Sequence, residues 1–262
     1  MVCLQRYRYY AALIVLGTGT GVYAQVSSIN SATITPRVFN DIPGASFSGA
    51  NLYQPPTSSS ISLSEANVSA ATGFADRDVW QFSNNGATSA YQFQNNDYFH
   101  VSLDLTLTGS PITPRKEAGF LFSTASSGDI QFIVNTDGHE VVQFGGIGSY
   151  SFSVSNGMSY TSGTTITIGM TYFQDSNGRN ALMFSANGVN SPVQEFAAGA
   201  GIGNGSTLGG YFQIQNDPAN PSNSGSAAFA NISISPVIVP EPSATALIGA
   251  GMVFLLWRYR RR

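Results

Sequence analysis

Cysteine is almost absent from this chain. The 262 residues include only one, Cys3. It lies in an N-terminal segment that we expect to be removed, so the mature body would contain no cysteine. This excludes disulfide bonds, a thiol nucleophile and thiolate metal sites from the mature protein. A chain of this length can bury a sufficient core without disulfides.

Charge is also scarce. Charged residues make up 10% of the chain, against about a quarter in ordinary globular proteins. Residues 25–242 contain five basic and 14 acidic residues, a formal charge of −9. An acidic surface does not attract phosphate backbones, so we predict no nucleic-acid partner.

The usual catalytic motifs are missing. The chain has two histidines, His100 and His139, which we expect to be solvent-facing polar residues rather than zinc ligands. There is no G-x-S-x-G motif for a serine nucleophile. The E-x-D-x-x-E pattern, which would supply paired carboxylates for glycoside hydrolysis, is absent too. The sequence therefore predicts no catalytic residue and no metal-ligating set.

One acidic stretch, ADRDVW, could face a ligand. Asp76 and Asp78 are two residues apart, so on a strand both would lie on one side together with Trp80. Calcium takes carboxylate oxygens and tryptophan stacks on sugar rings, so this side could form a calcium site or a sugar-binding edge. The alternative is a turn, with Arg77 paired locally and Trp80 in the core. Calcium is the only cofactor that the sequence suggests.

The N-terminus has the layout of a secretory signal peptide. Arg6 and Arg8 precede an apolar run over residues 11–16, and small residues lead up to Ala24. We predict a signal peptide over residues 1–24, cleaved between Ala24 and Gln25. The alternative, an N-terminal membrane anchor, would need a longer apolar core.

The C-terminus has three parts: a proline-rich linker over residues 236–242, an apolar segment over 243–257, and a basic tail over 258–262. We predict that the apolar segment is a short transmembrane helix. Fourteen apolar residues span about 21 Å as a helix, less than a hydrocarbon core of about 30 Å. Such a short span suits temporary anchoring in the inner membrane. Four arginines would hold the cytoplasmic end of this helix: Arg258, Arg260, Arg261 and Arg262.

The order of these parts resembles the PEP-CTERM sorting signal of Gram-negative bacteria. The resemblance rests on the sequence VPEP, the apolar segment and the terminal arginines. It implies processing by exosortase, a membrane-embedded cysteine transpeptidase, with Pro240, Glu241 and Pro242 as the recognition element. It also implies export and delivery to the cell surface or the extracellular matrix. The alternative is an ordinary single-span tail anchor.

The body reads as all-β. Residues 25–72 are rich in Ser, Thr, Asn and Pro, and residues 73–235 carry a dense series of strand patterns. In YFHVSLDLTL, apolar residues alternate with polar ones from Phe99 to Leu107, the period of a half-buried strand. We found no window of helical periodicity. The pattern predicts an antiparallel β-sandwich of the jelly-roll kind.

The second half of the body resembles concanavalin A-like, or laminin-G-like, jelly rolls. The resemblance rests on the strand order from Thr164 through the Asn187-Gly188 turn to the closing strand FANISI.

Taken together, these features predict an exported surface or matrix protein whose body is not catalytic and contacts exopolysaccharide. Two alternatives remain open. One is a lectin-like carbohydrate-binding module, and the other is a polysaccharide hydrolase or lyase.

Overall fold

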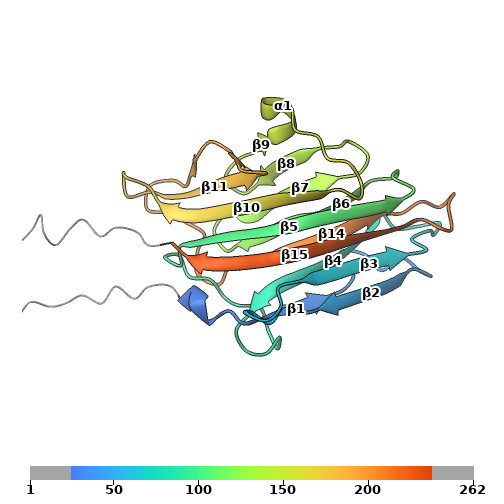
Figure 1. Ribbon diagram of the computed structural model, residues 1–262, viewed down its shortest axis with the longest axis horizontal. Coiled ribbons are helices and arrows are strands. Elements are labelled where there is room, and N and C mark those ends of the chain that lie inside the picture. The colour runs from blue at the N-terminus through green and yellow to red at the C-terminus, as the bar shows by residue number, and fades with distance from the viewer. Residues whose placement is uncertain (1–24, 238–262) are drawn as a thin grey trace, which may run out of the picture.

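Two antiparallel sheets pack face to face in this protein (Figure 1). The computed structural model describes residues 25–237. The sandwich confirms the predicted fold class. The signal peptide over 1–24, the helix over 243–257 and the basic tail all lie outside the described residues.

One sheet has seven strands, in the order β1–β4–β14–β6–β7–β8–β9. Neighbouring strands run antiparallel throughout. The strands are β1 Ser31–Thr35, β4 Ala75–Ser83, β14 Thr207–Gln215, β6 Lys116–Thr124, β7 Gly128–Asn135, β8 Val141–Gly145 and β9 Tyr150–Ser151.

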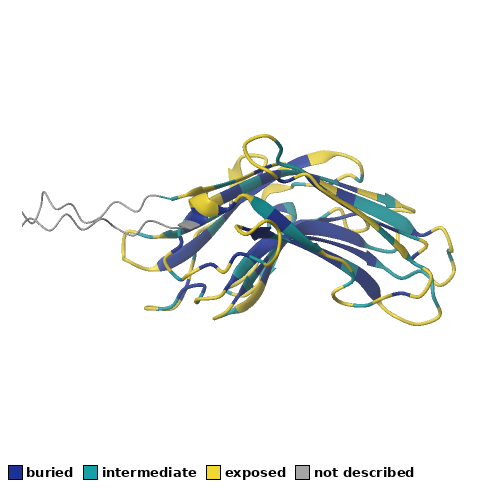
Figure 2. Cartoon of the chain, turned by 90° about the horizontal axis from the view of Figure 1, so that it is seen from below, coloured by how far each residue is buried: buried dark blue, intermediate teal, exposed yellow. Residues whose placement is uncertain are grey.

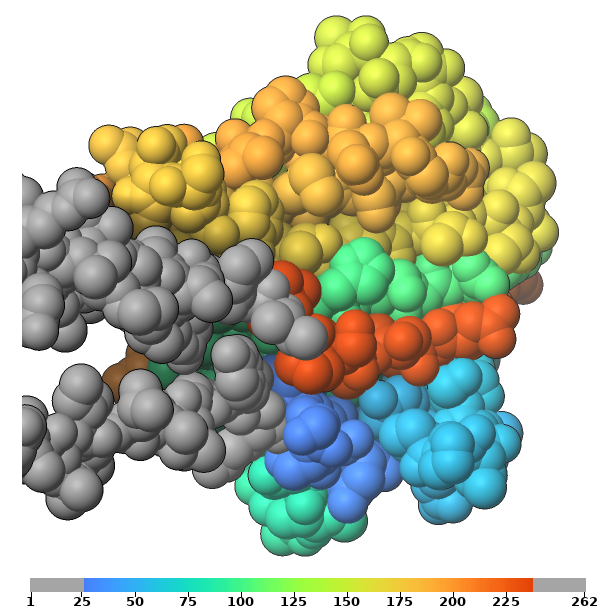
Figure 3. Space-filling view, turned by 60° about the vertical axis from the view of Figure 1, so that its left-hand side comes forward, coloured from blue at the N-terminus to red at the C-terminus, as the bar shows by residue number. Residues whose placement is uncertain are grey.

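The other sheet has eight strands, in the order β12–β11–β10–β5–β15–β3–β2, with β13 paired to β11. Strands β15, β5 and β10 lie side by side on the surface in Figure 3, although they are far apart in sequence. The strands are β12 Val189–Asn190, β11 Asn180–Ala186, β10 Thr165–Gln174, β5 Phe99–Ser110, β15 Ser224–Pro236, β3 Ile61–Ala66, β2 Ser46–Asn51 and β13 Gln194–Glu195.

The Ser/Thr-rich N-terminal part belongs to the same sandwich. β1 pairs with β4 in the seven-stranded sheet, and β2 and β3 extend the eight-stranded sheet beyond β15. A short 3-10 helix, η1 (Gln25–Ser28), precedes β1.

The stretch YSFSV alternates in polarity as a strand would, yet it is mostly helical. Only Tyr150 and Ser151 pair with β8, and α1 (Phe152–Asn156) follows. The Ser151 side chain caps the helix by accepting a hydrogen bond from the Val154 amide at 3.1 Å. Gly157 ends it in the left-handed conformation, at φ 65°. These caps at both ends stabilise a helix here, although the alternation of polar and apolar residues alone would favour a strand.

Alternating side chains build the core between the sheets, as Figure 2 shows by burial. On β5, Phe99, Val101, Leu103, Leu105 and Leu107 are all buried, while the residues between them face solvent. The same alternation gives each strand of the seven-stranded sheet an inner and an outer face.

The outer face of the seven-stranded sheet carries a second, smaller hydrophobic cluster. Val79, Ile133 and Tyr211 form it, with partly buried Leu121, Val142 and Phe144 packed against them. Their side chains belong to strands β4, β14, β6, β7 and β8 and point away from the main core. The outer face therefore buries apolar side chains that would be exposed on an ordinary solvent-facing sheet.

Candidate functional site

The predicted ligand edge lies inside the sandwich. Asp76, Asp78 and Trp80 do share one side of a strand, β4, but that side faces the core, and all three residues are 0% exposed. The alternative interpretation of this stretch as a turn is wrong, because β4 continues unbroken from Ala75 to Ser83.

The two aspartates anchor the segment that precedes β2. Asp78 accepts a hydrogen bond from the Arg37 amide at 3.0 Å, and Asp76 accepts one from the Ile42 amide at 2.8 Å. The Arg37 guanidinium also binds both carboxylate oxygens of Glu65, at 3.0 and 3.1 Å. These contacts give the aspartates a structural role.

Burial governs the protonation of this group. It raises the pKa of Asp78 to about 7, and the nearby charges of Glu65 and Asp76 act in the same direction. Burial raises the pKa values of Asp76 and Glu65 as well. Across residues 25–237, no group of three or more His, Cys, Asp or Glu side chains is arranged to hold a metal ion.

A row of polar side chains crosses the outer face of the seven-stranded sheet. Arg77 on β4 is in register with Gln213 on β14, Gln213 with Glu117 on β6, and Glu117 with Asn135 on β7. The Arg77 Nε donates to Gln213 at 2.7 Å, and the Gln213 amide donates to Glu117 at 3.1 Å. We call these four residues the polar row.

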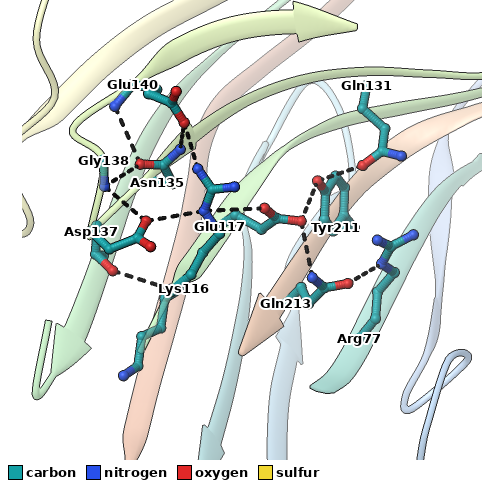
Figure 4. Close-up of polar contacts among 12 residues, drawn as sticks. Arg77, Lys116, Glu117, Gln131, Asn135, Asp137, Gly138, Glu140, Tyr211 and Gln213 are labelled. Atoms are coloured by element: carbon teal, nitrogen blue, oxygen red, sulfur yellow. Dashed lines mark hydrogen bonds and ion pairs between the residues drawn. The ribbon is translucent and has the colours of Figure 1, made fainter. Parts of the chain in front are cut away.

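Tyr211 lies in the next register row, against Gly119 of β6. Since Gly119 has no side chain, the ring can extend over β6, and its hydroxyl lies 3.0 Å from Glu117 and 2.7 Å from Gln131 (Figure 4). The Arg77 guanidinium lies over the ring, 4.8 Å from its centroid. Tyr211 is thereby fully buried.

The environment keeps Tyr211 protonated. Burial, followed by the charge of Glu117, raises the pKa of the Tyr211 hydroxyl well above its usual range. Burial also raises the pKa of Glu117, while the hydrogen bond from Tyr211 lowers it. The pair therefore holds a proton donor against a carboxylate acceptor.

Arg115 links the polar row to the β7–β8 hairpin. Its guanidinium contacts Asp137 at 3.0 Å, Glu140 at 2.5 Å and Glu117 at 3.9 Å. Asn135 holds the hairpin by accepting from the Gly138 amide at 3.0 Å and donating to Glu140 at 2.6 Å. One guanidinium is thus surrounded by three carboxylates.

None of the residues of this outer face was predicted as a site residue. The available signal was the alternation of polar residues along strands such as YFQIQ, where Tyr211, Gln213 and Gln215 share one face. The two histidines lie elsewhere: His100 is exposed on the eight-stranded sheet beside Thr171, and His139 follows the hairpin turn.

A comparison with protein families identifies the end of the chain. It carries a PEP-CTERM protein-sorting motif. The match covers residues 239–262, which include Pro240, Glu241 and Pro242, and confirms the resemblance. This motif marks an exported protein, anchored at its C-terminus before exosortase processes it. No helix among residues 25–237 is long and apolar enough to cross a membrane.

The body is similar to solved structures of carbohydrate-active proteins, and the jelly-roll resemblance is confirmed. An alginate lyase from Corynebacterium sp. aligns with a TM-score of 0.52 at 12% identity, over 79% of this chain and 94% of that one. The PL7 alginate lyase AlyA1 from Zobellia galactanivorans gives 0.45 at 9% identity, over 81% and 99%. The carbohydrate recognition domain of Emp46p gives 0.42 at 8% identity, over 74% and 89%. No curated protein sequence matches the chain.

These comparisons correct two predictions. We predicted a non-catalytic body and a protein that is not an enzyme. Both are contradicted, because the body has the fold of an alginate lyase.

Proposed function

We propose that this protein is an exported polysaccharide lyase, which cleaves uronate-containing chains on the outer face of its seven-stranded sheet. Arg77 carries the proposal. Among the described arginines, Arg37, Arg115 and Arg179 each pair with a carboxylate, whereas Arg77 has none within 4.0 Å. A guanidinium without an acidic partner, beside a tyrosine–glutamate pair, suits a sugar carboxylate.

Lyase chemistry needs three groups at a uronate. The proton on C5, next to the carboxylate, is removed, the C4–O bond breaks, and a C4–C5 double bond forms. Arg77 would neutralise the carboxylate as negative charge develops there. Glu117 would accept the C5 proton, and Tyr211 would donate its proton to the departing oxygen. The Tyr211–Glu117 hydrogen bond would then return the proton to Tyr211.

Access to Tyr211 depends on Arg77. The guanidinium covers the Tyr211 ring and also lies over the Phe39 ring, 5.6 Å from its centroid. A bound carboxylate would draw the guanidinium off the ring and uncover the hydroxyl. Substrate binding and exposure of the proton donor would then be one event.

The sorting motif supports the substrate class. An exported protein released by exosortase at the cell surface or in the matrix would meet exopolysaccharide there. The alginate lyase from Corynebacterium sp. shares the fold, which places an acidic-sugar polymer among the substrates to test.

The test measures formation of the C4–C5 double bond. We expect the exported protein, incubated with uronate-containing polysaccharides, to generate the ultraviolet absorbance of the C4–C5 unsaturation. Tyr211→Phe should lower the rate by about 100-fold or more, because it removes the proton donor. Tyr150→Phe is the matched control, since the Tyr150 hydroxyl bonds only Asn156 in an exposed position.

Two results would count against the proposal. No absorbance change with any uronate polymer would remove the lyase activity. Retention of the polymer without the double bond would favour the lectin-like alternative, carbohydrate binding at the same face.

A further inference from the structure

The charges along the polar row are unevenly distributed. Arg77 stands at one end without an acidic partner. At the other end, Arg115 is surrounded by Glu117, Asp137 and Glu140, which gives that group a net charge of −2. In Figure 4, Glu117 lies between Tyr211 and Gln213 on one side and the hairpin carboxylates on the other.

The hairpin carboxylates face solvent. The side chains of Asp137 and Glu140 are 36% and 46% exposed, so they act on anything that approaches this end of the row. A charge in water is felt over about 10 Å at 0.1 M salt. The group therefore repels a second carboxylate that follows the first along the row.

The remaining outer face offers no other cation. The register row through Tyr211 contains Val79, Gly119, Ile133 and Val142, and the next contains Gln81, Gly209, Leu121, Gln131 and Phe144. Lys116, the neighbour of Glu117, points to the interior and donates to the Pro111 carbonyl at 2.7 Å. Among the described residues, this face therefore has one place for a sugar carboxylate, at Arg77.

We infer that the site takes a heteropolysaccharide in which single uronates are separated by neutral sugars, rather than a homopolymer of uronates. The inference rests on the proposed function. A homopolyuronate carries a carboxylate on every sugar, so a chain lying along the row would place one at Arg77 and a following one against Asp137 and Glu140, beyond Glu117. Neutral sugars would instead bring no charge against this group.

The experiment compares two polymers with the exported wild-type protein. Gellan has one glucuronate in four sugars, and alginate has a uronate at every position. We expect double-bond formation per uronate to be about tenfold faster or more on gellan. Raising the ionic strength should increase the rate on alginate, because salt screens repulsion between like charges.

A variant tests the cause. Glu140→Gln removes one carboxylate of the hairpin and should raise the ratio of the alginate rate to the gellan rate several-fold. Glu195→Gln is the matched control, since Glu195 forms an exposed ion pair with Arg179 on the eight-stranded sheet. It should leave both rates unchanged.

Affinity electrophoresis in gels containing each polymer distinguishes the outcomes. Equal or faster cleavage of alginate would overturn the inference and leave the lyase proposal standing. Preferential retention by gellan without cleavage would overturn the lyase and support the inference. Neither cleavage nor retention of either polymer would overturn both.

Discussion

At the residue scale, Arg77 and Asp78 are adjacent in sequence and lie on opposite faces of β4. Arg77 reaches the outer polar row, whereas Asp78 is buried between the sheets. Alternation along the strand alone produces this separation. The sequence therefore identified ADRDVW as notable but selected the two aspartates instead of the arginine between them.

Burial of Asp78 should make stability depend on pH. Its pKa is raised to about 7 from 3.8, so the folded state holds a proton that the unfolded state releases. The free energy of unfolding should fall as pH rises from about 4 to about 7, by a few kcal/mol, and then level off. Burial also raises the pKa values of Glu65 and Asp76, so these groups add to the loss of stability as pH rises. The Arg37 guanidinium lowers both pKa values, whereas the charge of Asp41 raises them.

Asp78→Asn should flatten this slope, as measured by urea unfolding between pH 4 and 8. Its amide oxygen can still accept the hydrogen bond from the Arg37 amide. Asp104→Asn is the control, because hydrogen bonds from Thr167 and Asn231 lower the pKa of Asp104 and move its titration below this range. If the free energy of unfolding of Asp78→Asn changed with pH as steeply as that of the wild type, Asp78 would not be the source of the pH dependence.

At the element scale, the β7–β8 hairpin positions the acidic end of the site. The sequence has Asp137-Gly138 here, a pair that favours a tight turn, and β7 pairs with β8 around it. The sequence did not predict that Asn135 would be fully buried and hold the turn, because that depends on the approach of Glu140 and Gly138.

Asn135→Ala should destabilise the protein by about 1–3 kcal/mol, because it removes the side-chain acceptor of the Glu140 amide, one of the two acceptors of the Gly138 amide and the donor to the Glu140 carboxylate. The shift of the urea midpoint at pH 7 measures it. The equivalent change in the β10–β11 turn, Asn177→Ala, removes only an exposed contact to Asp175 and should have little effect. Equal losses in the two variants would show that Asn135 has no special role.

At the scale of the whole molecule, the polar row and the last described residues lie at opposite ends of the sandwich. Pro236, near the last described residue, pairs with Phe99 at the start of β5. β5 runs to Ser110, and a short connection leads to Lys116 at the start of β6, beside the polar row. The polar row therefore lies away from the end of the sandwich that carries Pro236.

This arrangement predicts separate control of sorting and activity. Glu241→Ala should prevent processing, so intact mass should show the tail retained on the variant and removed from the exported wild type. Cleavage of polysaccharide per molecule should be the same for both. A tail retained equally in both proteins would contradict processing at the Pro-Glu-Pro motif, and a loss of activity in the variant would contradict the separation.

The sequence by itself determined the sorting motif and the all-β class. Both depend on local order: prolines, an apolar segment and arginines in succession, and a two-residue period along each strand. Only the tertiary structure decided where the site lies. Alternation gives every strand two faces but does not say which strands pair, and the pairing of β4, β14, β6 and β7 is what brings Arg77, Gln213, Glu117 and Asn135 into one row.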